Sequence, residues 1–219
     1  NSQEELDYIL EKIIQFCEKQ KLPKPTFVVI QSGTRVMEMR NVGSFDSPIR
    51  IANEVPAEIQ VPKMIEICNK HKVFMKEHNT DYLSDDALRW HPRLGIHAAN
   101  VAPEFGVAET FALLKIMKEF DFHHLADEFL RISYESKKWE KWMLIETEAD
   151  DKAKALIAGH YVFSNNEFLV IKEEVNRKLV SVGIDLDGYL KGEVKKSISR
   201  YMQHFRLLKL YEKSSNINS

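Results

Sequence analysis

Residues 73–82 read Val73-Phe74-Met75-Lys76-Glu77-His78-Asn79-Thr80-Asp81-Tyr82, an apolar run that passes at once into a dense polar cluster. The first three residues predict a buried strand, and the polar residues predict its carboxyl end. Because side chains alternate across a strand, Lys76 and His78 share one face and Glu77 takes the other. Ligands of parallel α/β folds bind at the carboxyl ends of the strands, so this cluster predicts a functional edge.

Similar runs lie on either side of this strand. Phe27-Val28-Val29-Ile30 predicts a strand buried on both faces, ended by Ser32-Gly33, and residues 94–99 predict a third strand. Helices are expected between them, at residues 3–20 with a Ser2–Glu5 capping box, 57–70, 84–90 and 107–119. Residues 34–56, which include Pro48 and Pro56, predict a long irregular loop. The alternation predicts right-handed βα units around a parallel sheet.

The rest of the chain predicts helices alone. They are expected at residues 124–143, 149–158, 166–181, 185–191 and 193–212, with Gly159, Gly183 and Gly192 as breaks. A closed (β/α)8 TIM barrel needs eight strands and about 250 residues. The sequence therefore predicts an α/β fold that is the C-terminal portion of such a barrel, residues 1–122, followed by a helical extension, residues 123–219. The alternative is a small three-stranded α/β layer capped by the C-terminal helices.

Composition limits the function classes. The 219 residues are 44% hydrophobic, and 31 basic against 33 acidic residues give a net charge of −2. This charge argues against nucleic-acid and membrane partners, and we expect neither a membrane span nor a signal peptide. Cys17 and Cys68 lie in amphipathic patterns and are expected as buried thiols in a reducing, cytoplasmic compartment. Neither GxxxxGK[ST] nor GxGxxG occurs, so no nucleotide cofactor is indicated.

Polar side chains follow all three predicted strands. His78 is a candidate metal ligand with Asp81 or Glu77 beside it, a candidate general base, or a histidine that only caps the strand end. The predicted catalytic residues are His78, Asp81 and Glu77. The predicted substrate-binding residues are Gln31, Gly33, Lys76, Asn79, Asn100 and Glu104. Weaker candidates are His97, expected after the third strand or as a buried histidine, and Arg35, Arg40 and Arg50, expected as anion ligands or as solvated side chains.

The segment from Asn100 to Gly106 leads into a predicted helix. Free amides at a helix N-terminus favour an anion, so a sugar phosphate is the expected ligand there. The alternative for this segment is an ordinary strand-to-helix turn.

The segment His78-Asn79-Thr80-Asp81-Tyr82 resembles the non-catalytic subunit family of class II D-tagatose-1,6-bisphosphate aldolase, which carries His-Ser-Thr-Asp-Tyr there. Val29-Ile30-Gln31-Ser32-Gly33 is similar to the family's Val-Val-Gln-Pro-Gly, and Val101-Ala102-Pro103 to its Val-Gly-Pro. The chain departs from the family at Ser32 and Asn79. The resemblance covers roughly residues 5–210, which match only the C-terminal half of the family's length.

The resemblance implies a class II aldolase-type barrel whose sixth, seventh and eighth strands are those predicted here. It implies an accessory subunit in carbohydrate metabolism that binds a sugar phosphate beside His78, Asp81 and Gln31, and that associates with a catalytic aldolase chain or with itself. Members have also been labelled tagatose-6-phosphate kinases, which the missing nucleotide motifs do not favour here.

Two alternatives remain open. The first is an enzyme, a metal-dependent ketose-phosphate or uronate epimerase or an aldolase-type lyase, in which His78 binds a divalent zinc or manganese ion. Metal ligands from the family's first half would be missing from this chain. The second is a non-enzymatic module whose helical tail mediates assembly.

Overall fold

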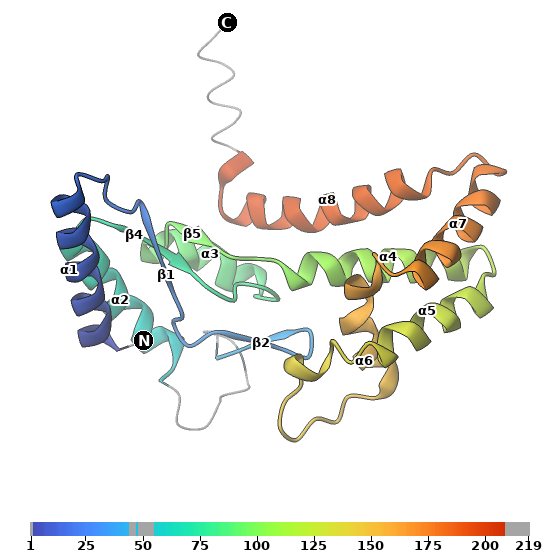
Figure 1. Ribbon diagram of the computed structural model, residues 1–219, viewed down its shortest axis with the longest axis horizontal. Helices are drawn as coiled ribbons and strands as arrows, with labels where there is room; N and C mark the ends of the chain where they lie inside the picture. Colours follow the sequence, from blue (N-terminus) through green and yellow to red (C-terminus); the bar gives the residue numbers. More distant parts are fainter. Residues whose placement is uncertain (1, 44–46, 48–54, 209–219) are drawn as a thin grey trace, which may run out of the picture. The chain divides into compact units, whose positions relative to one another are not determined.

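A computed structural model describes residues 2–43, 47 and 55–208 (Figure 1). Its contacts divide the chain into two compact units. Unit 1 consists of Asn1–Val36, Arg40–Val101 and His204–Ser219, and unit 2 of Met37–Met39 and Ala102–Gln203. The predicted domain boundary between residues 122 and 123 is not tested by this grouping and stays a prediction.

The elements of the first half are α1 (Gln3–Gln20), β1 (Phe27–Ile30), β2 (Arg35–Met37), β3 (Arg40–Val42), α2 (Ala57–His71), β4 (Phe74–Glu77), α3 (Asp85–Leu94) and β5 (Ala98–Ala99). The sheet of unit 1 has the order β1-β4-β5, with parallel pairing throughout. The predicted parallel βα arrangement is confirmed, and the described residues form no closed barrel.

One face of this sheet packs against helices. Its core contains Leu6 and Leu10 of α1, Val61 and Met64 of α2, and Met75 of β4. Two local predictions hold, since Ser2 and Glu5 form the capping box of α1 and the Ser84 hydroxyl caps α3. Both cysteines are buried free thiols, as expected, and burial raises the pKa of Cys68 to about 11.

The prediction that β1 is buried on both faces is wrong. Phe27 and Val29 keep 44% and 52% of their surface exposed, and Phe74 on β4 keeps 48%. Alternate residues of a strand point to opposite faces. Ile30 and Met75 therefore face the helices, while these three side chains lie on a face that no described helix covers.

Two further expectations for the first half of the chain are corrected. Residues 35–42 are not irregular, because β2 and β3 pair as a two-stranded sheet. Residues 44–46 and 48–54 of the expected loop, which include Pro48 and Arg50, lie outside the described residues. The third strand is shorter than predicted, because α3 extends to Leu94 and ends at Gly95 in the left-handed conformation, which leaves β5 only two residues.

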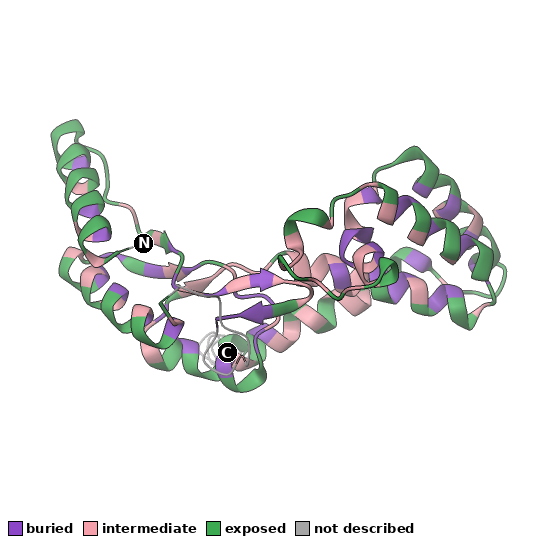
Figure 2. Cartoon of the chain, turned by 90° about the horizontal axis from the view of Figure 1, so that it is seen from below, coloured by how far each residue is buried: buried purple, intermediate pink, exposed green. Residues whose placement is uncertain are grey.

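The elements of the second half are α4 (Pro103–Glu119), α5 (His123–Glu135), the 3-10 helix η1 (Glu140–Trp142), α6 (Asp151–Ala158), the 3-10 helix η2 (Gly159–Val162), α7 (Asn166–Val180) and α8 (Leu186–His204). Buried and exposed residues alternate around these helices (Figure 2). Their core is built around Leu113, Met117, Phe129, Val175 and Leu179.

Two helix predictions in this half are wrong. Residues 124–143 do not form one helix, because α5 ends at Glu135 and η1 follows separately. Residues 185–191 and 193–204 form the single helix α8, so Gly192 does not break it, and residues 209–212 lie outside the described part. Among the described helices, none combines the length and apolar sequence of a membrane span.

Candidate functional site

The carboxyl ends of the three parallel strands meet at one edge of unit 1. The His78 amide donates to the Ile30 carbonyl over 2.9 Å, which joins the ends of β1 and β4. The Asn100 amide donates to the Glu77 carbonyl over 3.0 Å, and this bond joins the ends of β4 and β5. The ladder therefore brings Gln31, His78 and Asn100, each the first residue after its strand, to the same edge.

His78 is the titratable side chain exposed at this edge. Its Nδ1 lies 3.1 Å from the side-chain nitrogen Nδ2 of Asn100. Because an amide nitrogen only donates, Nδ1 accepts this hydrogen bond and the neutral ring carries its proton on Nε2. Gln31 is exposed and Asn100 half-buried. The edge thus presents an imidazole N–H and two side-chain amides, which suit the oxygens of a phosphate or a sugar.

Several hydrogen bonds fix the loop after β4. The Thr34 hydroxyl donates to the His78 carbonyl over 3.0 Å, and the Asn79 amide to the Thr34 carbonyl over 3.3 Å. The Asn41 amide donates to the carbonyls of Asn79 and Asp81, each over 2.8 Å. Asn79, predicted to bind substrate, therefore bonds the neighbouring backbone with its side chain, in a left-handed conformation with φ of 59°.

Glycine is needed in the loop after β1. Gly33 has a φ of 92°, and a Cβ added there would lie 2.8 Å from the Val55 carbonyl oxygen. Gly33 therefore contributes close backbone packing at the edge, and its predicted part in substrate binding would rest on backbone groups.

A buried polar network lies beneath the edge. The Ser32 hydroxyl donates to one carboxylate oxygen of Glu77, and His91 Nε2 pairs with the other. All three side chains are almost fully buried. In a nucleophile–base arrangement the histidine stands between serine and carboxylate, but here the carboxylate stands in the middle. The network therefore has a structural role, since it joins the loop after β1, the end of β4 and α3.

Both ring nitrogens of His91 face hydrogen-bond acceptors. Nδ1 lies 2.9 Å from the Ala87 carbonyl oxygen and Nε2 faces Glu77, so the protonated ring satisfies both. Burial acts to lower the pKa of His91, but the hydrogen bond and charge of Glu77, with the Ala87 carbonyl, outweigh it and raise this pKa.

The remaining candidates lie elsewhere. Asp81 is buried, and Lys76 is half-buried on the face of His78, one pleat before the strand end. Glu104 and Gly106 belong to unit 2. There the Glu104 carboxylate accepts from the Tyr201 hydroxyl and lies 3.3 Å from Arg200, while Gly106 packs against His160.

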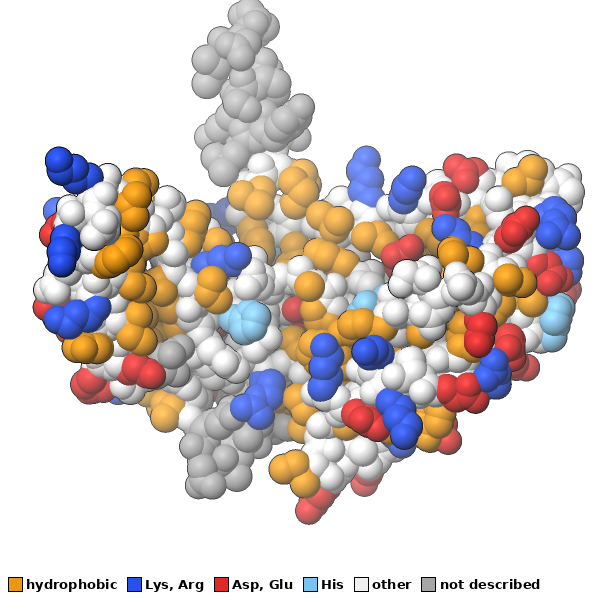
Figure 3. Space-filling view, in the orientation of Figure 1, with side chains coloured by type: hydrophobic (Ala, Val, Ile, Leu, Met, Phe, Trp, Pro, Cys, Tyr) orange, Lys and Arg blue, Asp and Glu red, His pale blue; other side chains and the backbone are white. Residues whose placement is uncertain are grey.

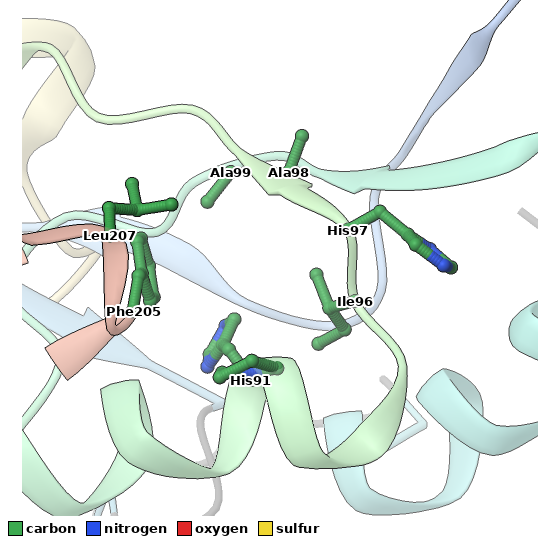
Figure 4. A pocket seen from close by; sticks show the side chains of 8 residues that line it. His91, Ile96, His97, Ala98, Ala99, Phe205 and Leu207 are labelled. Atoms are coloured by element: carbon green, nitrogen blue, oxygen red, sulfur yellow. The ribbon is translucent and has the colours of Figure 1, made fainter. Parts of the chain in front are cut away.

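The expected position of His97 after a strand is wrong. It precedes β5, and its ring stacks on Phe74 at a centroid distance of 4.5 Å. Figure 4 shows this ring directed away from the other labelled side chains. Arg35 and Arg40 lie on the β2–β3 pair, half-buried and exposed, and Arg50 is outside the described residues.

A cavity of about 320 Å³ lies beside β5 (Figure 4). Its lining consists of His91, Pro92, Ile96, His97, Ala98, Ala99, Phe205 and Leu207. Most of these side chains are apolar, so the cavity does not suit a sugar phosphate as well as the polar strand ends do.

The described residues do not by themselves form a metal site. In residues 2–43, 47 and 55–208, no three His, Cys, Asp or Glu side chains come close enough to hold a metal ion. The neighbour of the His78 ring is an amide, which does not resemble the donor set of zinc or manganese. The predicted divalent metal therefore stays a prediction.

Sequence reasoning missed Asn41 and His91. Asn41 comes from the β2–β3 pair, 38 residues before Asn79, and no sequence pattern indicates that contact. For His91, the alternation of side chains along β4 was the one indication in the sequence. It turns Glu77 toward the helix layer, where a buried carboxylate needs a polar partner.

Comparisons with known proteins bear on the fold. Neither a family model nor a curated protein matches the chain. Among solved structures, the chain is similar to a probable tagatose 6 phosphate kinase from Sinorhizobium meliloti 1021, with a TM-score of 0.54 and 17% identity. The match covers 83% of this chain and 47% of the other, so the chain spans about half the length of that neighbour. At this identity the similarity concerns the fold.

Proposed function

We propose that this chain acts in carbohydrate metabolism and binds a sugar phosphate at the carboxyl ends of β1, β4 and β5. The observation that carries the proposal is the exposed His78–Asn100 pair beside Gln31 at this edge of the sheet. The buried hydrogen-bond network of Ser32, Glu77 and His91 holds the edge in place. The proposal uses residues of unit 1 alone.

Each group has a role that follows from its position. The Asn100 amide holds the neutral His78 ring with its proton on Nε2, which donates to a phosphate or hydroxyl oxygen. Gln31 offers both a donor and an acceptor to sugar hydroxyls. Glu77 and Asp81, which the sequence predicts as catalytic, are buried and support the edge in this proposal.

The finer part of the proposal is an accessory role in a cytoplasmic tagatose-bisphosphate aldolase. The His-Asn-Thr-Asp-Tyr segment supports it, because it resembles the accessory subunit family. The name of the structural neighbour also concerns a tagatose phosphate, although that protein is described as a probable kinase. The partner would be a zinc-dependent catalytic aldolase chain, to which this chain contributes stability and full activity.

Calorimetric titration with tagatose 6-phosphate tests the binding site, with unphosphorylated tagatose as the matched ligand. The wild-type chain should bind the phosphate ester, and His78→Ala should weaken binding at least tenfold. His123→Ala is the control, because His123 is an exposed histidine on α5 of unit 2. An absence of binding, or equal loss in both variants, would count against the site.

Aldolase assays test the accessory role separately. Addition of this chain should raise the activity of a catalytic tagatose-bisphosphate aldolase subunit. Without such an effect, the accessory role fails while the binding site can stand. Stoichiometric zinc or manganese in the wild type, lost in His78→Ala, would instead favour the metal-dependent epimerase or lyase.

A further inference from the structure

Unit 1 exposes apolar side chains on its sheet layer, at β1, and on its helix layer, at α1. We define the β1 flank as Phe27 and Val29 of β1 together with Ile9, Ile13 and Phe16 of α1. All five side chains are exposed, by 39–59% of their surface. Figure 3 shows hydrophobic side chains forming a column at the edge of unit 1 where α1 and β1 lie. Exposed apolar side chains gathered along one edge in this way are typical of an interaction site.

The sheet layer of the β1 flank has a free backbone edge. The carbonyls of Thr26 and Ile30 accept from the Phe74 and His78 amides over 2.9 Å each. Neighbouring residues of a strand direct their backbone groups to opposite edges. The N–H and C=O groups of Phe27 and Val29 therefore point away from β4, toward an edge where no described strand pairs. This edge can accept a further parallel strand.

The helix layer turns an apolar stripe to the same side. At 100° per residue, the exposed stripe Ile9-Ile13-Phe16 lies about 70° from the buried stripe that contains Leu6 and Leu10. Asp7 lies on the opposite side of the buried stripe and pairs with Lys70 and His71 of α2. Because α2 also contacts β4, the stripe turned away from α2 is turned away from β4 as well.

In the described part of the chain, the uncovered face of the sheet carries one charged group, Lys76, between apolar and aromatic ones. Lys76 stands opposite Val29 and Ala98 in the register. Within the described part of the chain its ammonium has no ion-pair partner. The other side chains of this face are Phe27, Val29, Gln31, Phe74, His78, His97 and Ala98, none of them acidic. Whatever covers this face must supply a carboxylate, because an unpaired buried charge is strongly unfavourable.

We infer that the β1 flank is the docking surface for a polypeptide of βα units. Its strand adds to β1 in parallel, its helix packs on Ile9, Ile13 and Phe16, and an acidic side chain of its sheet faces Lys76. The size of the structural neighbour supports this occupant. The match covers 47% of that chain, so the remaining 53% has no counterpart in the chain described here. The sequence predicts Lys76 as a substrate ligand, whereas its place one pleat below the edge favours the docked polypeptide.

A second copy of this chain satisfies the surface less well. A twofold-related copy would pair β1 with its own equivalent and present the same side chains again. Among the described residues, neither the stripe nor the uncovered sheet face contains a carboxylate, so two copies of Lys76 would be covered without a counter-charge. The charge on this face therefore favours a different polypeptide over a homodimer.

The probe is the part of the neighbour's chain outside the match, expressed as a separate polypeptide and mixed with the full 219-residue chain. Light scattering should give the mass of a 1:1 complex. Hydrogen–deuterium exchange should slow at least tenfold at the Phe27 and Val29 amides, with no change in α7 of unit 2. Both readouts are independent of sugar binding, so this inference and the proposed function can fail separately.

The decisive variant is Phe16→Glu, which should weaken the complex at least tenfold. Tyr8→Glu is the matched control, since Tyr8 is an exposed aromatic residue of the same helix outside the stripe, and it should leave affinity unchanged. The inference is overturned by three results: no complex from a folded chain, protection that avoids β1, or equal effects of both variants. A dimer of the chain alone that Phe16→Glu abolishes would overturn it in favour of a second copy.

Discussion

At the residue scale, the Glu77 carboxylate holds the strand-end site together, because it joins Ser32 from one loop to His91 from α3. Glu77→Gln removes one partner of a buried ion pair and should lower the free energy of unfolding by about 3 kcal/mol. Urea unfolding measures this loss. The control is Glu128→Gln, which breaks an exposed pair with Arg131 and should cost far less stability than Glu77→Gln. Equal losses would mean that the network contributes no more than surface pairs.

The same pair makes stability depend on pH. The folded-state pKa of His91 is raised above its ordinary value of 6.5, so its contribution is complete below the unfolded-state pKa. This contribution is lost as the pH rises through the folded-state pKa. The free energy of unfolding should therefore fall on the alkaline side of 6.5, more in wild type than in Glu77→Gln. Identical alkaline slopes for the two proteins would contradict this assignment.

Gly33 is the second residue on which the edge depends. Gly33→Ala places a Cβ 2.8 Å from the Val55 carbonyl oxygen and also forces a left-handed alanine. Gly183→Ala is the control, because it shares the left-handed conformation with φ of 79° but meets no atom within 4 Å. We expect the control to lose about 1 kcal/mol, and Gly33→Ala to lose about 1–2 kcal/mol more with weaker phosphate binding. Similar losses would show that the close approach costs nothing.

At the element scale, α8 runs unbroken through Gly192. This glycine lies in the helix interior, and a Cβ there meets nothing within 4 Å. Gly192→Ala should therefore stabilise the protein by about 0.5–1 kcal/mol in urea unfolding. Gly188→Ala is the comparison, because its Cβ would lie 2.6 Å from an Asp185 carboxylate oxygen, and it should gain less. If Gly192→Ala is destabilising, two helices separated by a break describe this segment better.

His160 in η2 gives unit 2 an acid-sensitive element. Among the described residues its Nδ1 has no hydrogen-bond partner, and burial, followed by the Lys141 charge, lowers the pKa of His160 to about 4. The neutral ring is favoured in the folded state, so stability is complete above 6.5 and falls as the pH drops from 6.5 toward 4. His160→Gln should flatten this acid limb in unfolding measured at pH 7 and pH 5. An unchanged limb would exclude His160 as its source.

How far the sequence predicts these elements depends on the length of their patterns. β1, β4 and α1 follow from apolar runs and a capping box, and the strand ends place His78 and Asn100 beside each other. β5 and the β2–β3 pair have two or three residues per strand, too few for a periodicity. Asn41 and His91 reach the site through tertiary packing, which no local pattern encodes. The apolar runs also predicted that both faces of the sheet are buried. Such a run shows that a strand suits burial, but it does not show whether the residues that would cover the second face belong to this chain.

At the scale of the whole molecule, each unit has a hydrophobic core of its own. The buried residues of the core around Met75 lie between Leu6 and Ile96 in the sequence. Those of the core around Phe129 lie between Ala112 and Leu190, so the two cores have no residue in common. The clustering of predicted strands before residue 100 and of helices after it already separates these two cores in the sequence. Substitutions in one core should therefore act on the amides of that core first.

Native-state hydrogen exchange of the Glu77→Gln variant checks this separation. Glu77→Gln removes a buried charge partner in unit 1, so exchange at the β4 amides of Met75 and Glu77 should accelerate by about two powers of ten, as expected for about 3 kcal/mol. Amides of Phe129 and Val175 in unit 2 should keep their wild-type rates, because no atom of their core has changed. Equal acceleration in both cores would mean that the chain opens as one cooperative unit, and the two cores would then have to be treated as a single folding domain.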